Sequence, residues 1–158
     1  MSMPSLPPHT SPLAVVLDTN VVLDVLVFGD GVAKPLAEAL SAGALVPWAD
    51  EKTLQELEWV LAMPTFKLSA PERREVFARY RGLVRLCTEE APAPVKLELE
   101  LPRCRDRDDQ KFLQLAARSR AAWLVSKDKR VLSMADRHGL PFVILAPKQA
   151  ARELTRTS

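Results

Sequence analysis

The sequence has few of the residues on which several common kinds of functional site depend. Its 158 residues include two cysteines and two histidines, and their spacing matches no zinc-binding pattern. Without a secretion signal, Cys87 and Cys104 are expected to be free thiols in a reducing cytoplasm. The only closely spaced glycines are Gly29 and Gly31, so no phosphate-binding loop is predicted. The absence of a Gly-x-Ser-x-Gly motif argues against a serine hydrolase of the α/β type.

Long hydrophobic runs are also absent. No apolar stretch approaches the roughly 18 to 20 residues that span a membrane, so we predict a cytoplasmic protein with no membrane segment. Residues 1–12 are rich in proline and serine and are predicted to form a disordered tail. Residues 13–158 have the length and the ordinary hydrophobic fraction, 47% over the whole chain, of a single domain with its own core.

Short apolar runs alternate with amphipathic helical patterns along this domain. We predict strands at 14–18, 44–47, 84–88, 122–126 and 141–145, and helices at about 20–27, 32–41, 50–62, 69–82, 108–119, 130–138 and 147–155. The proline-containing segment 89–107 is predicted to be a loop. Strands that alternate with helices predict an α/β fold of three layers, α/β/α, around a central parallel sheet.

Acidic residues lie where two of the predicted strands end. Asp18 follows Val15-Val-Leu17, and Asp128 follows the strand at 122–126. A further acidic group, Asp106, Asp108 and Asp109, stands at the start of a predicted helix. Because ligands of open α/β sheets bind outside the carboxyl ends of the strands, we expect several of these carboxylates to converge. Each one alone is explained equally well as a helix cap or turn residue.

A converging set of carboxylates favours a metal ion over a purely structural role. Like charges in a partly buried site repel one another, and a divalent cation relieves that repulsion. Oxygen ligands suit Mg²⁺ or Mn²⁺, and such an ion polarises a phosphodiester and activates water for hydrolysis. The fourth candidate acid is Glu56, on the predicted helix at 50–62; by itself it resembles an ordinary solvated helix residue.

Four segments together resemble the PIN-domain family, in particular its VapC-like toxins of toxin–antitoxin systems. They are Val15-Val-Leu-Asp-Thr-Asn-Val21, Leu54-Gln-Glu-Leu-Glu-Trp-Val-Leu-Ala-Met-Pro64, Cys104-Arg-Asp-Arg-Asp-Asp-Gln-Lys-Phe-Leu113 and Val125-Ser-Lys-Asp128. The resemblance covers about residues 14 to 147. It implies a PIN-like fold and a single PIN-like nuclease domain.

The resemblance also implies roles for individual residues. The catalytic and metal-binding acids would be Asp18, Glu56, Asp109 and Asp128, with Asp106 as an additional metal ligand and Asn20 and Ser126 in support. Spacing alone leaves Asp108 open as the third acid. Asp24 has no counterpart in the family's site and is interpreted as structural or as a surface residue.

The activity that the resemblance implies is metal-dependent endoribonuclease cleavage of single-stranded or looped RNA. Family members often form homodimers and often pair with an antitoxin that blocks the site, so both partners are predicted. Arg105 and Arg107 alternate with acids at the predicted site's edge and are predicted to bind the RNA backbone. A formal net charge of +2 permits nucleic-acid binding without requiring it. Alternatively, these arginines pair with the neighbouring carboxylates.

Other functions remain open at this stage. A PIN-like module that binds RNA or protein without cutting is disfavoured because all four acids are present. A DNA-directed nuclease of the same fold is not distinguished, since nothing in the sequence recognises the ribose 2′-hydroxyl. A phosphatase of the haloacid dehalogenase type would need Asp-x-Asp after the first strand, and position 20 is Asn.

Overall fold

Strands and helices alternate along the chain in the computed structural model, which describes residues 12–29, 31–88, 107–136 and 139–157, with the backbone alone at 107–109 and 157. The strands are β1 (Leu13–Leu17), β2 (Leu45–Ala49), β3 (Arg85–Leu86), β4 (Trp123–Val125) and β5 (Val143–Leu145). The α-helices are α1 (Thr19–Leu23), α2 (Lys34–Ala42), α3 (Glu51–Leu61), α4 (Ala70–Leu83), α5 (Arg107–Arg118), α6 (Lys129–Leu132) and α7 (Pro147–Thr157). The predicted tail lies outside the described residues, apart from Pro12.

The strands form one parallel sheet in the order β3-β2-β1-β4-β5. Its centre is the pairing of β1 with β4, in which Val15 lies opposite Trp123 and Leu17 opposite Val125. The chain runs outward from β1 to β2 and β3, and then returns to the other side of β1 for β4 and β5. The predicted α/β fold with a central parallel sheet is therefore confirmed.

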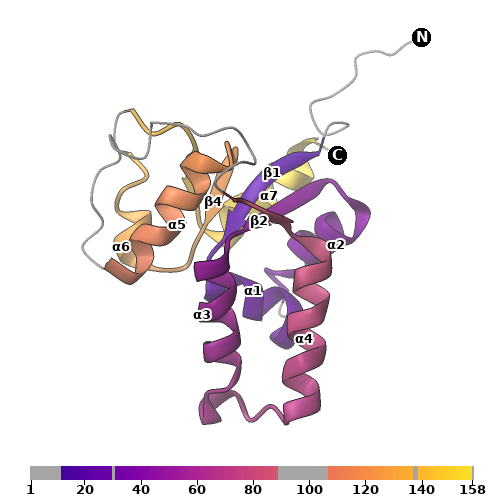
Figure 1. The fold of residues 1–158 in the computed structure, drawn as a ribbon. Helices are drawn as coiled ribbons and strands as arrows, with labels where there is room; N and C mark the ends of the chain where they lie inside the picture. The colour runs from indigo at the N-terminus through magenta and orange to yellow at the C-terminus, as the bar shows by residue number, and fades with distance from the viewer. Residues whose placement is uncertain (1–11, 30, 89–106, 137–138, 158) are drawn as a thin grey trace.

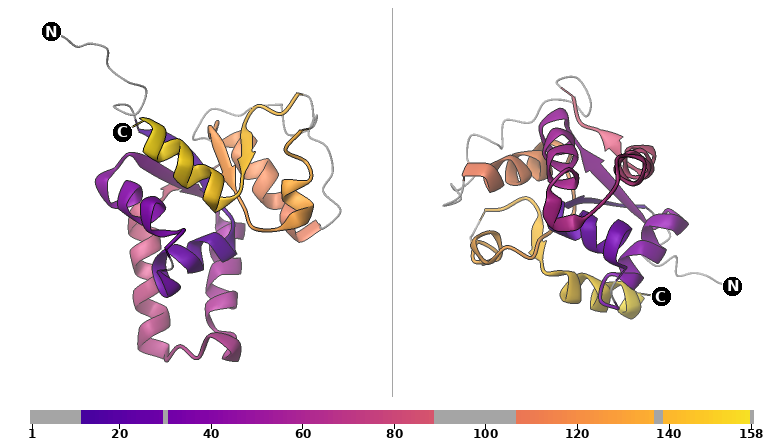
Figure 2. Two further views of the ribbon diagram at one scale, coloured as in Figure 1. Left: turned by 180° about the vertical axis from the view of Figure 1, so that it is seen from behind. Right: turned by 90° about the horizontal axis from the view of Figure 1, so that it is seen from below.

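Helices cover both faces of this sheet (Figures 1 and 2). Along β1, Val15 and Leu17 pack into the core formed with α1, α2, α3 and α4, whereas Val16 packs into a second core beneath α5. Ala150 of α7 belongs to the first core, and α7 contacts α2. Strands that bury side chains on both faces appear in sequence as continuous apolar runs, which is why the strand at 14–18 could be predicted.

Helices α3 and α4 lie side by side and project away from the sheet (Figure 1). Each begins at a capping box, in which a side chain at the cap and one three residues later bond each other's backbone N–H. In α4 these residues are Ser69 and Glu72, and in α3 they are Asp50 and Thr53. The hydrogen bonds to Ser69 lower the pKa of Glu72.

Two of the predicted helices differ from the structure. The helix predicted at about 20–27 is α1 followed by a π-helical segment, Asp24–Phe28, which ends at Gly29 in the left-handed conformation. The helix predicted at 130–138 ends at Leu132 and continues as tight turns, in which the N–H of Met134 bonds the carbonyl of Val131. The spacing of apolar residues does not distinguish such turns from an α-helix, because side chains recur at nearly the same interval along both.

None of the helices in the described part of the chain is long and apolar enough to cross a membrane.

Candidate active site

The point where the chain reverses its direction of travel across the sheet lies between β1 and β4. In doubly wound α/β folds, a crevice opens at this point, outside the carboxyl ends of the two strands. Asp18 follows β1 there, and its N–H donates to the carbonyl of Val125, at the end of β4, over 3.0 Å. Asp18 and Asp128 therefore follow neighbouring strands at the centre of the sheet.

The Asp18 carboxylate is buried, and both of its oxygens accept hydrogen bonds. Only 6% of the residue is exposed. The Ser126 hydroxyl donates to one carboxylate oxygen, and the Val21 N–H donates to the other over 3.0 Å, which caps α1. Burial raises the pKa of Asp18, as does the charge of Asp128, while hydrogen bonds from Ser126 and the N–H groups of Val21 and Lys127 oppose the rise. Since the pKa rises on balance, ionising this carboxylate costs the folded protein free energy.

Ser126 links the two acids. It is fully buried, and while its hydroxyl donates to Asp18, its oxygen accepts the Asp128 N–H over 3.0 Å. The Asp128 side chain is half-buried and accepts the Arg130 N–H over 2.7 Å, which caps α6. Both acids therefore cap helices, so the structural alternative considered for each of them from the sequence applies. Capping occupies one oxygen of each carboxylate, so it is compatible with a further role.

The Glu56 carboxylate is held near Asp18 by a hydrogen bond from Thr19. The buried Thr19 hydroxyl, next to Asp18 in sequence, donates to one oxygen of the Glu56 carboxylate. The other oxygen forms an ion pair with Lys111 of α5, with Nζ at 2.5 Å. Sequence reasoning missed both partners. Thr19 lies within the quoted Asp-Thr-Asn motif and was detectable, whereas nothing in the pattern around Lys111 distinguishes it from a solvated lysine.

The other predicted site residues are described only in part. Asn20 lies on α1 and is exposed. Asp109 belongs to the first turn of α5, where the structure describes the backbone alone, and the same holds for Arg107 and Asp108. Asp106 and Arg105 lie outside the described residues. Their predicted roles stay predictions.

The acids do not form a complete metal cage in the part of the chain that the structure describes. Among those residues, no group of three or more His, Cys, Asp or Glu side chains is placed to hold a metal ion. What the structure brings together is an oxygen-only pair, Asp18 and Asp128, with Glu56 held nearby by Thr19 and Lys111. A buried carboxylate with a raised pKa beside a second one is the electrostatic setting that a divalent cation relieves.

An ion pair joins the segments that follow β1 and β4. Asp24, at the start of the π-helical segment, is buried, and the ammonium group of Lys127 lies 2.7 Å from its carboxylate. Lys127 stands between Ser126 and Asp128, so the pair ties the turn that carries both residues to the helix that follows Asp18. This favours the structural interpretation of Asp24.

Tyr80 of α4 is also buried near the site, and burial, followed by the charge of Asp18, raises its pKa.

Comparison with known proteins identifies the family of this chain. Residues 14–130 match the PIN domain family, and all four predicted acids fall within that range. The chain belongs to the PIN domain family. The predicted resemblance is therefore confirmed.

Two individual proteins show how far this PIN domain resembles others. An uncharacterized protein of Methanocaldococcus jannaschii is 25% identical over 126 residues, which cover 78% of this chain and 76% of that protein. Among solved structures, the crystal structure of VapBC2 from Rickettsia felis, bound to a DNA fragment from their promoter, contains a chain that matches with a TM-score of 0.56 and 12% identity. That match covers 85% of this PIN domain and 98% of the other chain. At this identity the likeness establishes the fold alone.

Proposed function

We propose that this PIN domain is a Mg²⁺- or Mn²⁺-dependent endoribonuclease. The observation that carries the proposal is the buried Asp18 carboxylate at the reversal point of the sheet, linked through Ser126 to Asp128. PIN domains are generally nucleases. Burial makes the Asp18 carboxylate costly to ionise, and a second carboxylate lies beside it. Such a pair has little structural benefit beyond capping, and it fits a cation site.

The proposed metal ligands are Asp18, Glu56, Asp109 and Asp128, with Asp106 as an additional one. When bound, the ion would polarise the phosphodiester and lower the pKa of a water molecule for attack on phosphorus. Ser126 fixes the orientation of the Asp18 carboxylate, and Thr19 fixes that of Glu56. Lys111 balances the charge of Glu56 in the metal-free protein and places an ammonium group beside the acids, where it would attract a phosphate.

We further propose that the protein is the toxin of a toxin–antitoxin pair, acts in the cytoplasm and forms a homodimer. The likeness to a chain of the VapBC2 structure supports an antitoxin partner, because that structure is named as a two-component complex. The substrate would be RNA that offers unstacked bases and accessible phosphates, as single strands and loops do.

The test is cleavage of single-stranded RNA by the purified full-length protein. We expect cleavage with Mg²⁺ or Mn²⁺, its loss in EDTA, and its return when Mn²⁺ is added in excess. Asp18→Asn should reduce the rate at least about 100-fold, since even residues that only orient metal ligands contribute 10- to 100-fold. The control is Asp136→Asn, which removes an exposed acid beyond α6.

The outcome separates the alternatives. Cleavage that survives thorough chelation contradicts the metal mechanism. Cleavage of DNA of the same sequence, without cleavage of RNA, shows a DNA-directed nuclease. Binding of RNA with no cleavage under any metal shows a non-catalytic PIN module. Metal binding itself can be followed apart from activity, by the Mn²⁺ electron paramagnetic resonance signal, which should be quenched by the wild type and not by Asp18→Asn.

A further inference from the structure

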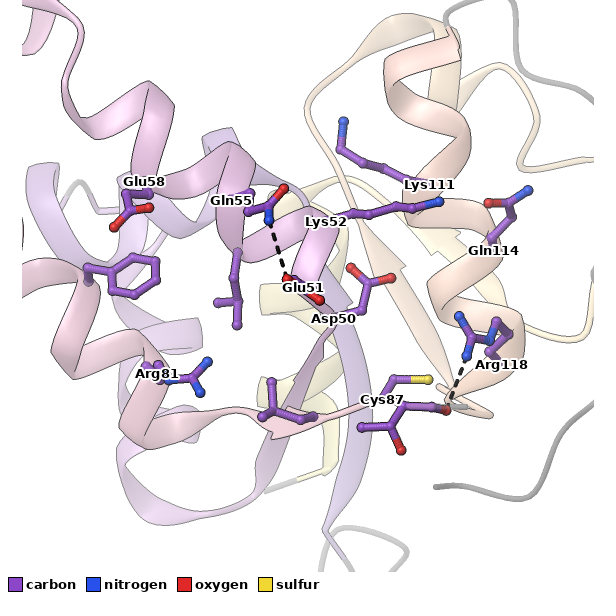
Figure 3. A pocket seen from close by; sticks show the side chains of 14 residues that line it. Asp50, Glu51, Lys52, Gln55, Glu58, Arg81, Cys87, Lys111, Gln114 and Arg118 are labelled. Carbon is purple, nitrogen blue, oxygen red and sulfur yellow. Dashed lines mark hydrogen bonds between the residues drawn. The ribbon is translucent and has the colours of Figure 1, made fainter. Parts of the chain in front are cut away.

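A pocket of about 830 Å³ lies beside the acids, between α3, α4 and α5 (Figure 3). It includes Asp50, which follows β2, and Cys87 and Thr88, which follow β3. Because β1, β2 and β3 are neighbours in a parallel sheet, their carboxyl ends share one edge. The pocket therefore lies along the same edge of the sheet as Asp18.

Side chains that donate hydrogen bonds line this pocket from three helices. Lys52 and Gln55 come from α3, Arg81 from α4, and Lys111, Gln114 and Arg118 from α5. In Figure 3, Lys52 extends from α3 towards α5. The three residues of α5 are spaced three and four apart, so they share one face of that helix.

The pocket offers cations to an anionic ligand. Its four cationic side chains face three acids of the lining, Asp50, Glu51 and Glu58, and one of the four, Lys111, is paired with Glu56. Two of the acids are already occupied at the start of α3: Asp50 accepts the Thr53 N–H over 2.8 Å, and Glu51 accepts the Gln55 amide. Among the residues that the structure describes, Lys52 and Arg81 form no ion pair, and both are exposed. These two cations are thus accessible to a phosphate.

Lys111 connects the pocket to the acids. Its side chain lines the pocket, and its ammonium group forms the ion pair with Glu56. A nucleic-acid strand with one phosphate at the acids would therefore pass Lys111 where it enters the pocket.

The pocket also has an apolar part, to which Leu54, Phe77 and Leu86 contribute. Phe77 is half-buried, and Leu86 is one of the exposed large hydrophobic residues of the molecule. Aromatic and apolar side chains beside cations are the combination with which proteins bind single strands, since bases pack on the former and phosphates contact the latter. A volume of this order holds a ligand of drug size, which is that of one or two nucleotides.

We propose that this pocket is a nucleotide subsite, in which one or two nucleotides of single-stranded RNA next to the cleaved phosphate are held by Lys52, Arg81, Lys111 and Arg118. The proposal rests on the ribonuclease function proposed above. It assigns the substrate contacts to cations of α3, α4 and α5, in addition to those predicted for Arg105 and Arg107.

The test compares two double variants that remove the same charge. Lys52→Ala with Arg81→Ala changes the pocket. Lys34→Ala with Arg74→Ala changes exposed cations of α2 and α4 that do not line it. Binding of a fluorescent single-stranded oligoribonucleotide is measured by anisotropy in EDTA, so that nothing is cleaved, over a series of salt concentrations. The melting temperature of each variant confirms that it is folded.

We expect the pocket variant to bind RNA more weakly and to lower the slope of log K against log salt by about 1.4, because each phosphate contact on a single strand contributes about 0.7. The control variant should retain the slope of the wild type. In the presence of metal, the pocket variant should raise KM more than it lowers kcat, since such contacts bind the ground state and the transition state alike.

Two failures are distinguishable. If the wild type cuts RNA and both double variants share its salt slope and KM, the subsite is refuted while the ribonuclease function stands. If the wild type neither binds nor cuts RNA, the proposed function fails, and the subsite fails with it.

Discussion

Asp18 combines a catalytic candidate and a helix cap in one side chain. Asparagine can also cap a helix, so Asp18→Asn keeps that hydrogen bond while removing the charge. Because burial raises the pKa of Asp18, this group stabilises the metal-free fold fully below its unfolded pKa, and the contribution is lost as pH rises through the folded pKa.

We therefore expect metal-free Asp18→Asn to melt at the same temperature as the wild type, or higher, at neutral pH. Its advantage should shrink as the pH falls and Asp18 takes up a proton. Thermal unfolding in EDTA between pH 4 and pH 8 measures this difference. A clear loss of stability in the variant at neutral pH would show that the carboxylate acts mainly as a structural cap.

The Asp24–Lys127 ion pair is unequally buried, and this predicts unequal effects of its removal. The Asp24 side chain is 12% exposed and that of Lys127 is 46% exposed. Lys127→Met leaves a buried carboxylate without its cation and should cost about 1–3 kcal/mol of unfolding free energy. Asp24→Asn leaves a lysine that water solvates and should cost less than about 1 kcal/mol. Urea unfolding of both variants and of the double variant measures the two losses. A larger loss in Asp24→Asn than in Lys127→Met would show that Lys127 is held mainly by other contacts.

How far the site could be predicted differs from residue to residue. Asp18 and Asp128 were predictable because strand ends in a parallel sheet are marked by apolar runs, whereas Ser126 was indicated by the family resemblance alone. Glu56 lies on a helix whose position gives no sign of convergence, so the sequence pattern offered it only as a candidate, and the family resemblance assigned its role. Lys111 could not be found, because its role depends on the approach of α5 to α3, and a contact between helices far apart in sequence leaves no local pattern.

At the level of elements, α4 is stabilised by its capping box as well as by its core contacts. Only Val76 and Tyr80 of this helix are buried. The Ser69 hydroxyl accepts the Glu72 N–H, so Ser69→Ala leaves that donor without its partner. We expect a loss of about 0.5–2 kcal/mol, measured by urea unfolding. Ser41→Ala, at an exposed position inside α2, serves as the matched control and should change stability by less than about 0.5 kcal/mol. Equal effects of both variants would mean that the box contributes nothing.

The order of elements was predictable throughout, and their ends were less so. Gly43 ends α2 and Pro64 follows α3, as residues of these types commonly do. By contrast, β3 is two residues long where a strand at 84–88 was predicted. Its length is set by how far it pairs with β2, which is a tertiary effect.

At the scale of the whole molecule, the fold extends past the family match. That match ends at residue 130, yet β5 pairs with β4, and Ile144 and Ala150 are buried in the two cores. Removing residues 139–158 would expose the edge of β4 and apolar surface on both faces of the sheet.

We expect that truncation to give an insoluble or unfolded chain. Removing residues 1–11, the greater part of the predicted tail, should leave the melting temperature unchanged. Circular dichroism and thermal unfolding of the two truncated proteins provide the comparison. A cooperative transition in the chain that lacks 139–158 would show that β5 and α7 are accessory, whereas a large loss on removing 1–11 would contradict the predicted domain boundary.

The hydrogen bond from Ser126 to Asp18 spans 108 residues of sequence, and this has a consequence for biosynthesis. At about 5–20 residues per second, a ribosome needs on the order of 5 to 20 seconds to add the second partner after the first. Throughout that interval, the nascent chain carries Asp18, and later Glu56 as well, but has no β4 to place beside β1. An interrupted translation that stops before Trp123 therefore releases a polypeptide without the paired acids, and the proposed activity begins only when synthesis is nearly complete.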